Sequence, residues 1–129
     1  QKTAYEIPKR DWSSDVCSSD LREQGGDIAV RPMRGTSIRG LAQLIVEACS
    51  FDFIYVDGSH IARDTLTDAC MAWPLLKKGG VMVFDDYMWF GSPLLLHRPK
   101  PAVDAFTSIF GQELFVLHNG YQVAVQRTA

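Results

Sequence analysis

The length, composition and charge of the chain describe one ordinary globular domain. It has 129 residues, of which 47% are hydrophobic and 22% charged, and its formal net charge is −2. Enough apolar side chains are present for one core, and no excess of Lys and Arg favours nucleic acid as a partner. The apolar runs are too short to span a bilayer, and no signal peptide opens the sequence. We therefore expect a cytoplasmic protein that acts on a small molecule and binds neither nucleic acid nor membrane, while the oligomeric state stays open.

The first residues differ in pattern from the rest of the chain. Residues 11–21, DWSSDVCSSDL, nearly repeat Ser-Ser-Asp and show neither the alternation of a strand nor the spacing of a helix. The longer stretch EIPKRDWSSDVCSSDL resembles the translation of a sequencing adapter that occurs at the broken ends of metagenomic gene fragments. We expect residues 1–21 to be a non-native or disordered leader without core contacts; a natural flexible arm is the alternative. The domain is then residues 22–129.

From residue 28 onward, short apolar runs alternate with amphipathic segments. Strands are expected at residues 28–30, 51–56 and 81–84, and the second is apolar enough to be buried on both faces. Thr36 or Ser37 can cap a helix between the first two strands. Helical spacing of apolar residues marks this helix and the next one: Ile38, Leu41, Leu44 and Ile45, then Leu66, Ala69, Cys70, Trp73 and Leu76.

The second helix is expected to run on to the glycine pair before the third strand. Lys77 and Lys78 suit the negative end of a helix, and Gly79 or Gly80 can take the left-handed conformation that terminates it. A strand, a helix and a strand in this order form a right-handed crossover with parallel strands, which predicts an α/β fold.

The last quarter of the chain predicts antiparallel strands. A short helix near residues 103–110 precedes two apolar runs, 114–117 and 121–125, which flank Asn119 and Gly120. Asn-Gly between two strands is the strongest short-range signal for a hairpin. We therefore expect a mostly parallel sheet that ends in an antiparallel hairpin.

Three segments together carry a resemblance to a known family. They are FDFIYVDGSH at 51–60, LLKKGGVMVFDDY at 75–87, and AVDAF at 102–106 with HNGYQVAV at 118–125. In this order and spacing they resemble the second half of class I S-adenosylmethionine-dependent methyltransferases, in the subgroup of catechol and macrolide-sugar O-methyltransferases.

The resemblance implies a truncated Rossmann-like fold and a definite reaction. That reaction is transfer of a methyl group from S-adenosylmethionine to an oxygen of a small-molecule acceptor. The family's first strand, its Gly-rich turn and the acidic residue after its second strand have no counterpart in this sequence. We therefore expect a C-terminal fragment that lacks the first two strands and whose own activity is open. The alternative function is a non-catalytic Rossmann-type module that binds a nucleotide or a sugar.

Acidic side chains follow two of the predicted parallel strands. Asp57 comes directly after one strand, and Asp85 and Asp86 follow the next. Ligands bind beyond the carboxyl ends of strands in such sheets, and three crowded carboxylates repel one another unless a cation or N–H groups offset them. Oxygen ligands suit Mg²⁺, and the resemblance implies that these positions hold it. The alternative is that Asp57 and Asp86 make only turn and helix-cap hydrogen bonds.

A candidate general base lies three residues beyond the first acid. His60 has an ordinary pKa that lets it accept a proton from a hydroxyl group at neutral pH, while Asp57 would hold the metal or the acceptor. The alternative for His60 is a residue at the helix start that contacts solvent or Asp57. The aromatic residues Tyr87, Trp89 and Phe90 either wall an apolar acceptor or belong to the core.

Five residues are candidates for cofactor binding. Gly35, Thr36 and Ser37 match the loop that touches the cofactor adenine in the resembled enzymes, and Asp57 and Gly58 form the turn after the next strand. Capping of the following helix explains Thr36 and Ser37 equally well.

Overall fold

The computed structural model describes residues 31–129, and residues 36–129 form one compact unit that contains every element below. The expected strand at 28–30 and the leader at 1–21 lie outside the described residues. Among those described, no helix has the length and hydropathy needed to cross a membrane. The elements in chain order are α2 (Ser37–Val46), β1 (Phe51–Val56), α3 (Ala62–Ala72), a 3-10 turn (Trp73–Leu75), β2 (Leu76–Phe84), a second 3-10 turn (Leu95–His97), α4 (Lys100–Ile109), β3 (Leu114–Asn119) and β4 (Val123–Arg127).

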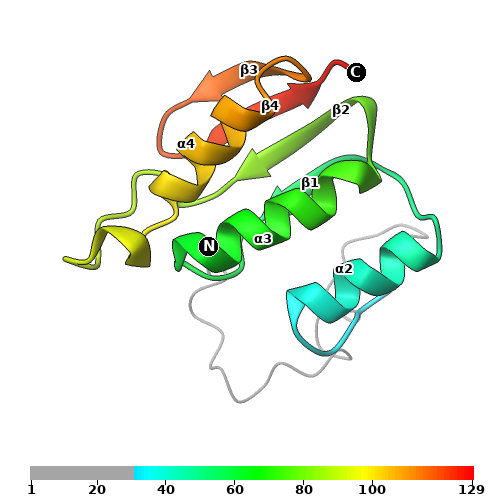
Figure 1. The fold of residues 1–129 in the computed structure, drawn as a ribbon, viewed down its shortest axis with the longest axis horizontal. Helices are drawn as coiled ribbons and strands as arrows, with labels where there is room; N and C mark the ends of the chain where they lie inside the picture. The colour runs from blue at the N-terminus through cyan, green and yellow to red at the C-terminus, as the bar shows by residue number, and fades with distance from the viewer. Residues whose placement is uncertain (1–30) are drawn as a thin grey trace, which may run out of the picture. The chain divides into compact units, whose positions relative to one another are not determined.

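The strands form one mixed sheet in the order β1-β2-β4-β3 (Figure 1). β1 and β2 are parallel, and their last residues, Val56 and Phe84, are paired. β4 is antiparallel to both β2 and β3. The α/β class, the parallel crossover through α3 and the terminal hairpin are thereby confirmed, and the described part of the sheet contains one parallel pair and two antiparallel pairs.

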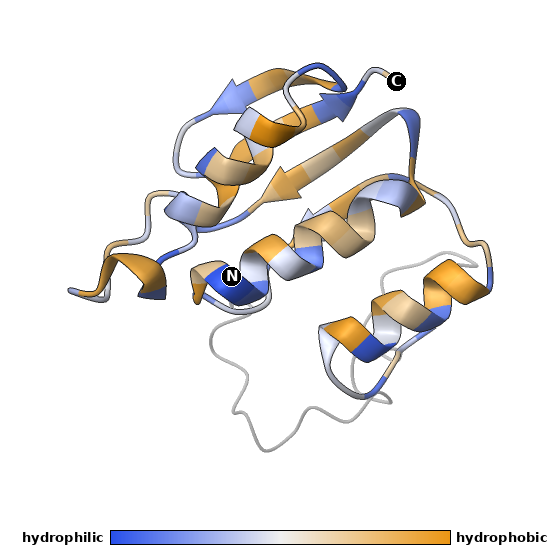
Figure 2. Cartoon of the chain, viewed as in Figure 1, coloured by the Kyte–Doolittle hydropathy of each residue, from blue (hydrophilic) through white to orange (hydrophobic). Residues whose placement is uncertain are grey.

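The core lies where α3 and α4 pack against each other and against the sheet. Phe106 of α4 is fully buried, and its ring meets the rings of Trp73 and Phe84 edge-on, with centroids 5.3 Å away in both cases. In Figure 2, β2 becomes hydrophobic toward its carboxyl end, where Met82 and Phe84 are buried. Burial of these large side chains fixes α3 and α4 on the sheet.

β1 is covered on one face only, which corrects the expectation of a strand buried on both faces. Ile54 packs against the core, whereas Phe53 is 57% exposed and Tyr55 45% exposed. The run of apolar residues therefore indicates a strand but does not fix how many of its faces are covered in the described part of the chain.

The end of the second helix was also predicted incorrectly. The helix stops at Ala72, and Lys77 and Lys78 lie in β2 rather than at the helix end. Pro74 explains the early stop because it lacks an N–H group and clashes with the preceding helical turn. Gly79 does adopt a left-handed conformation, φ 81°, but within β2.

The hairpin forms with a longer turn than a two-residue Asn-Gly loop. Asn119 pairs with Val123, so that residues 120–122 form the connection. Tyr121 and Gln122, expected in the second strand, lie in this connection. The turn places both of them at the same end of the sheet as the carboxyl ends of β1 and β2, because β4 runs antiparallel to β2 and Phe84 pairs with Val123.

Candidate active site

The predicted acidic residues lie together at the carboxyl edge of β1 and β2. The Asp85 backbone N–H donates to the carbonyl oxygen of Val56 at 3.0 Å, so the chain leaving β2 lies beside the chain leaving β1. Burial, followed by repulsion from Asp85 and Asp86, raises the pKa of Asp57, and the nearby His60 lowers it in part. The three carboxylates therefore interact electrostatically, as expected where β1 and β2 are neighbouring parallel strands.

Asp85 is held by side chains from two other elements. The Tyr55 hydroxyl donates to Asp85 Oδ2 at 2.6 Å, and Gln122 Nε2 donates to Asp85 Oδ1 at 3.0 Å and to the Tyr55 hydroxyl oxygen at 2.7 Å. The Asp86 backbone N–H also donates to Asp85 Oδ1, at 2.8 Å. Burial would raise the pKa of Asp85, but these hydrogen bonds outweigh it and lower the pKa, so this carboxylate is stabilised in its charged form.

Asp86 joins His60 to the hairpin turn. Its carboxylate oxygen Oδ2 lies 2.7 Å from His60 Nε2, and its Oδ1 accepts a hydrogen bond from the Tyr121 hydroxyl at 3.0 Å. The residue is 5% exposed, and its backbone φ is +53°, in the left-handed region that residues other than glycine rarely adopt. Such strain is characteristic of functional sites, where surrounding contacts hold the conformation.

His60 stands on a tightly bonded turn between β1 and α3. Ser59 fixes this turn, since its Oγ accepts from the Ile61 N–H at 3.1 Å and donates to Asp64 Oδ2 at 3.0 Å, and its carbonyl accepts from Thr65 Oγ1 at 2.8 Å. The His60 ring stacks on the indole of Trp89 with centroids 4.2 Å apart. Both observations place His60 at the acidic edge, where it contacts Asp86 rather than Asp57.

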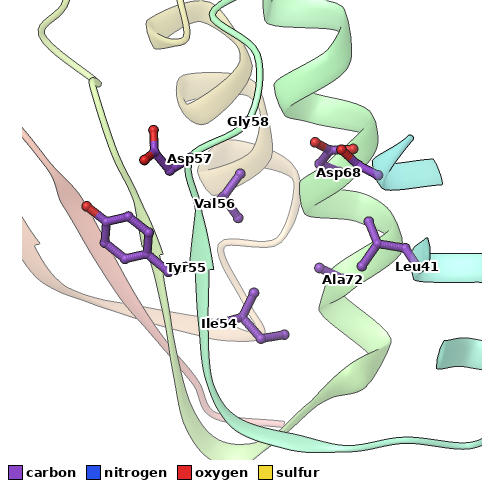
Figure 3. A pocket seen from close by; sticks show the side chains of 9 residues that line it. Leu41, Ile54, Tyr55, Val56, Asp57, Gly58, Asp68 and Ala72 are labelled. Atoms are coloured by element: carbon purple, nitrogen blue, oxygen red, sulfur yellow. The ribbon is translucent and has the colours of Figure 1, made fainter. Parts of the chain in front are cut away.

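A cavity of about 310 Å³ opens beside these acids, between β1, α2 and α3. Figure 3 shows Ile54 and Val56 directed toward α3, while Tyr55 and Asp57 point to the opposite side of β1. The lining combines an apolar floor with a polar end, and its members are Ser37, Leu41, Ile54, Tyr55, Val56, Asp57, Gly58, Asp68 and Ala72. This mixture is typical of pockets that bind small molecules.

The cavity contains three of the five predicted cofactor residues, Ser37, Asp57 and Gly58. Thr36 instead caps α2, its hydroxyl oxygen accepting from the Arg39 N–H at 3.4 Å. Gly35 has φ 138° and belongs to the other unit of the chain, so its place relative to the cavity is not defined.

Asp68 is a cavity residue that the sequence analysis missed. Burial chiefly raises its pKa, helped by repulsion from Asp64, while a hydrogen bond from Ser37 opposes the shift. A Cβ atom on Gly58 would lie 3.2 Å from Asp68 Oδ2, so the absence of a side chain there lets the carboxylate approach the turn closely. The available signal was its helical spacing from Thr65 and Ala72, which places it on the side of α3 that meets the sheet.

A second cavity, of about 540 Å³, lies next to His60, between the start of α3 and the segment that leads into α4. Most of its lining is apolar and consists of Ile61, Ala62, Leu66, Leu96, Pro101 and Ala102. Arg63 and His97 are the polar lining residues. Of the three aromatic residues that follow the acids, Tyr87 is buried in the core, Trp89 contacts His60, and Phe90 is 55% exposed.

The predicted metal ligands are close together but already hold hydrogen bonds. Within residues 31–129, no group of three or more His, Cys, Asp or Glu side chains is arranged to hold a metal ion. Asp85 accepts hydrogen bonds from Tyr55 and Gln122. Asp86 accepts a hydrogen bond from Tyr121 and also contacts His60. The oxygen-only donor set suits a hard cation, and an ion here would share these carboxylate oxygens with their present donors or replace one of them.

Comparison with solved structures places the fold among methyltransferases. The O-methyltransferase NovP superposes with a TM-score of 0.69 at 22% identity, over 91% of this chain and 46% of NovP. The MycE methyltransferase of the mycinamycin biosynthetic pathway, solved with Mg, S-adenosylhomocysteine and mycinamycin VI, superposes with a TM-score of 0.57 at 21% identity, over 76% of this chain and 32% of MycE. At these identities the likeness shows the fold alone.

Sequence relatives agree with the structural ones. A protein of Arabidopsis thaliana named as a caffeoyl-CoA O-methyltransferase is 27% identical over 89 residues, which are 69% of this chain and 37% of the relative. A Dictyostelium discoideum protein with the same activity in its name is 33% identical over 58 residues, 45% of this chain and 22% of the relative. The chain thus spans less than half the length of these relatives. A family model described as a methyltransferase domain matches residues 7–87, more than half of the chain, and the chain therefore belongs to this methyltransferase family.

Proposed function

We propose that the protein containing this chain transfers a methyl group from S-adenosylmethionine to an oxygen atom of a small-molecule acceptor. The observation that carries the proposal is the 2.7 Å contact between His60 and Asp86 at the strand edge where Asp57 and Asp85 also lie. An oriented imidazole at this edge supplies a proton acceptor in the place where α/β sheets bind their ligands. A cytoplasmic location, predicted from the sequence, is part of the same proposal.

The cofactor is assigned to the cavity between β1, α2 and α3. Its volume of about 310 Å³ lies at the low end of the usual range for ligand sites, roughly 300–1,000 Å³. The apolar floor suits an adenine ring, and the Asp68 carboxylate and the Ser37 hydroxyl at the polar end suit hydroxyl groups of the cofactor. Ser37, Asp57 and Gly58 line this cavity, and Thr36, which precedes Ser37 in the chain, is included in the assignment. When bound, the cofactor supplies the electrophilic methyl group.

The residues of this chain would position and deprotonate the acceptor. His60 takes the hydroxyl proton while Asp86 holds its ring in place. Asp57 holds the acceptor or the metal at the start of the same turn. The cavity of about 540 Å³ that begins at Ile61 offers room for an apolar part of the acceptor.

The proposal includes Mg²⁺ held by Asp57, Asp85 and Asp86. Burial, and after it repulsion from Asp85 and Asp86, raises the pKa of Asp57, and a bound cation would relieve the repulsion. An ion could replace the hydrogen bonds that Tyr121 and Gln122 of the hairpin turn donate to these carboxylates. Such a replacement would leave the contact between Asp86 and His60 intact. A divalent ion at this position would orient and polarise the acceptor oxygen.

Chelation and Asp85→Asn test the metal directly. Each should lower the transfer rate by about 10- to 100-fold or more. Mutation of residues that only hydrogen-bond to metal ligands already lowers activity by that factor, so loss of a ligand or of the ion should cost at least as much. Asp52→Asn is the matched control, since Asp52 pairs with Lys77 on an exposed part of β1. The rate is measured in excess EDTA, and then again after Mg²⁺ is restored. A rate that is unchanged in excess chelator would remove the metal from the proposal and leave the three carboxylates as hydrogen-bond acceptors.

The proposed activity is tested by transfer of a labelled methyl group. The protein is incubated with S-[methyl-³H]adenosylmethionine and a panel of small hydroxylated acceptors, both as this chain and as the longest natural form that contains it. We expect label to enter the acceptor and S-adenosylhomocysteine to accumulate in equal amount. Binding of the cofactor without any transfer to the panel would favour the alternative, a non-catalytic nucleotide- or sugar-binding module.

A further inference from the structure

We propose that Trp89, seated against Gly91, is a positioning residue that holds the His60 ring with its Nδ1 atom free to receive the acceptor proton. The inference rests on the proposed role of His60 in methyl transfer. It adds a residue that acts through His60, and it names the ring nitrogen that takes the proton. Three independent contacts carry it.

The first contact is the ring stack. The His60 and Trp89 ring centroids are 4.2 Å apart and their planes meet at 21°. The backbone produces this arrangement, because the Trp89 N–H donates to the Asp86 carbonyl oxygen at 2.9 Å and closes a turn after β2. Asp86, at the start of that turn, holds the left-handed conformation that brings the chain back over the imidazole.

The second contact is between Trp89 and Gly91. A Cβ atom on Gly91 would lie 2.3 Å from Cζ2 and 2.6 Å from Cε2 of the indole, closer than any real contact of that kind. Gly91 has no left-handed φ, so steric space rather than backbone conformation requires the glycine here. The indole therefore sits against bare backbone, and any side chain at position 91 would push it out of its place.

The third contact is the hydrogen bond that selects the nitrogen. A carboxylate accepts hydrogen bonds, so the 2.7 Å contact to Asp86 Oδ2 places the proton of the neutral imidazole on Nε2. The lone pair is then on Nδ1, which makes no hydrogen bond to any residue among 31–129. The His60 side chain is 38% exposed, so the imidazole ring is accessible from solvent.

The stack and the hydrogen bond restrict different motions. A single hydrogen bond at Nε2 still lets the ring swing about that bond, because the side-chain torsion next to an imidazole has a broad minimum. Stacking on a fixed indole removes this freedom by setting the plane of the ring. Together they aim the Nδ1 lone pair in one direction, and misplacement by about 1 Å of a reacting group can cost 10²-fold in rate.

The experiment compares Trp89→Leu and Gly91→Ala with Trp89→Phe and with the control Phe115→Leu, an exposed aromatic on β3. The readouts are the ¹⁵N chemical shifts of the His60 ring, assigned with His60→Asn, and kcat and KM for the acceptor. Wild type should show one sharp pattern with the proton on Nε2. Trp89→Leu and Gly91→Ala should broaden or average it and lower kcat by about 10- to 100-fold, with KM within a few-fold. Trp89→Phe should retain much of the wild-type pattern, and Phe115→Leu all of it.

Several results would overturn the inference. One is an unchanged His60 spectrum and kcat in Trp89→Leu, and another is a wild-type spectrum with the proton on Nδ1. A rise in KM at constant kcat would show that Trp89 binds the acceptor instead of positioning His60. If Trp89→Leu fails to fold, Gly91→Ala and Trp89→Phe decide. If wild type transfers no methyl group, the proposed function fails, while the ring spectra still test the positioning of His60.

Discussion

His60→Asn should lower the turnover number for methyl transfer by about 10²- to 10⁴-fold, the usual contribution of a positioned general base. Asn is too short to reach Asp86 as Nε2 does, but the hydrogen bonds of Ser59 fix the turn, so it should keep its shape while the proton acceptor is lost. Folding should therefore change little. The measurement is single-turnover transfer of labelled methyl at saturating cofactor, together with the affinity for S-adenosylhomocysteine, which should stay within a few-fold of wild type.

The control for this prediction is His118→Asn, because His118 is exposed on β3 and lies outside the proposed machinery. It should transfer the methyl group at the wild-type rate. If His60→Asn retains a rate within a few-fold of wild type, His60 is not the base. The alternative of a helix-start histidine that only contacts a carboxylate would then be the better description.

Phe106→Ala should reduce the free energy of unfolding by about 3–5 kcal/mol, as expected for truncation of a fully buried aromatic side chain. Phe106 is 0% exposed and its ring contacts those of Trp73, Phe84 and Phe110. Loss of the ring leaves a cavity where α4 meets α3 and β2. These elements hold the acids and His60 in place. The variant should therefore lose activity at lower temperatures than wild type, in proportion to the fraction of molecules that is unfolded.

Urea unfolding followed by circular dichroism checks the prediction, with Phe115→Ala as the control. Phe115 is the same residue type but 62% exposed, so its truncation should change stability by no more than about 0.5 kcal/mol. Equal losses for the two variants would contradict the core assignment. They would show that the exposed face of β3 carries as much of the packing as the buried ring of Phe106.

Local pattern explains what could be predicted about the fold. Helical spacing identified α2 and α3, the apolar run identified β1, and the Asn-Gly pair identified the hairpin. These signals depend on residues within about ten positions of one another. Errors arose where a competing local feature was overlooked, as when Pro74 ended the helix before the two lysines, or where coverage of a face depended on distant elements, as for β1.

The same distinction holds for the site. The sequence by itself indicated that Asp57 and Asp85 lie at the same edge of the sheet, because a crossover makes their strands parallel. It also placed His60 on the adjoining turn. That these two strands are neighbours was decided by the tertiary structure. The conformation of Asp86 and the groups that hold each carboxylate were decided by the tertiary structure alone.

Those groups come from distant positions in the chain. Tyr55 is 30 residues from Asp85, Gln122 is 37 residues from Asp85, and Tyr121 is 35 residues from Asp86. Periodicity contains no information about which side chains meet across such separations. The antiparallel return of β4 beside β2 brings the hairpin turn to the acids, and only folding of the whole sheet creates those hydrogen bonds.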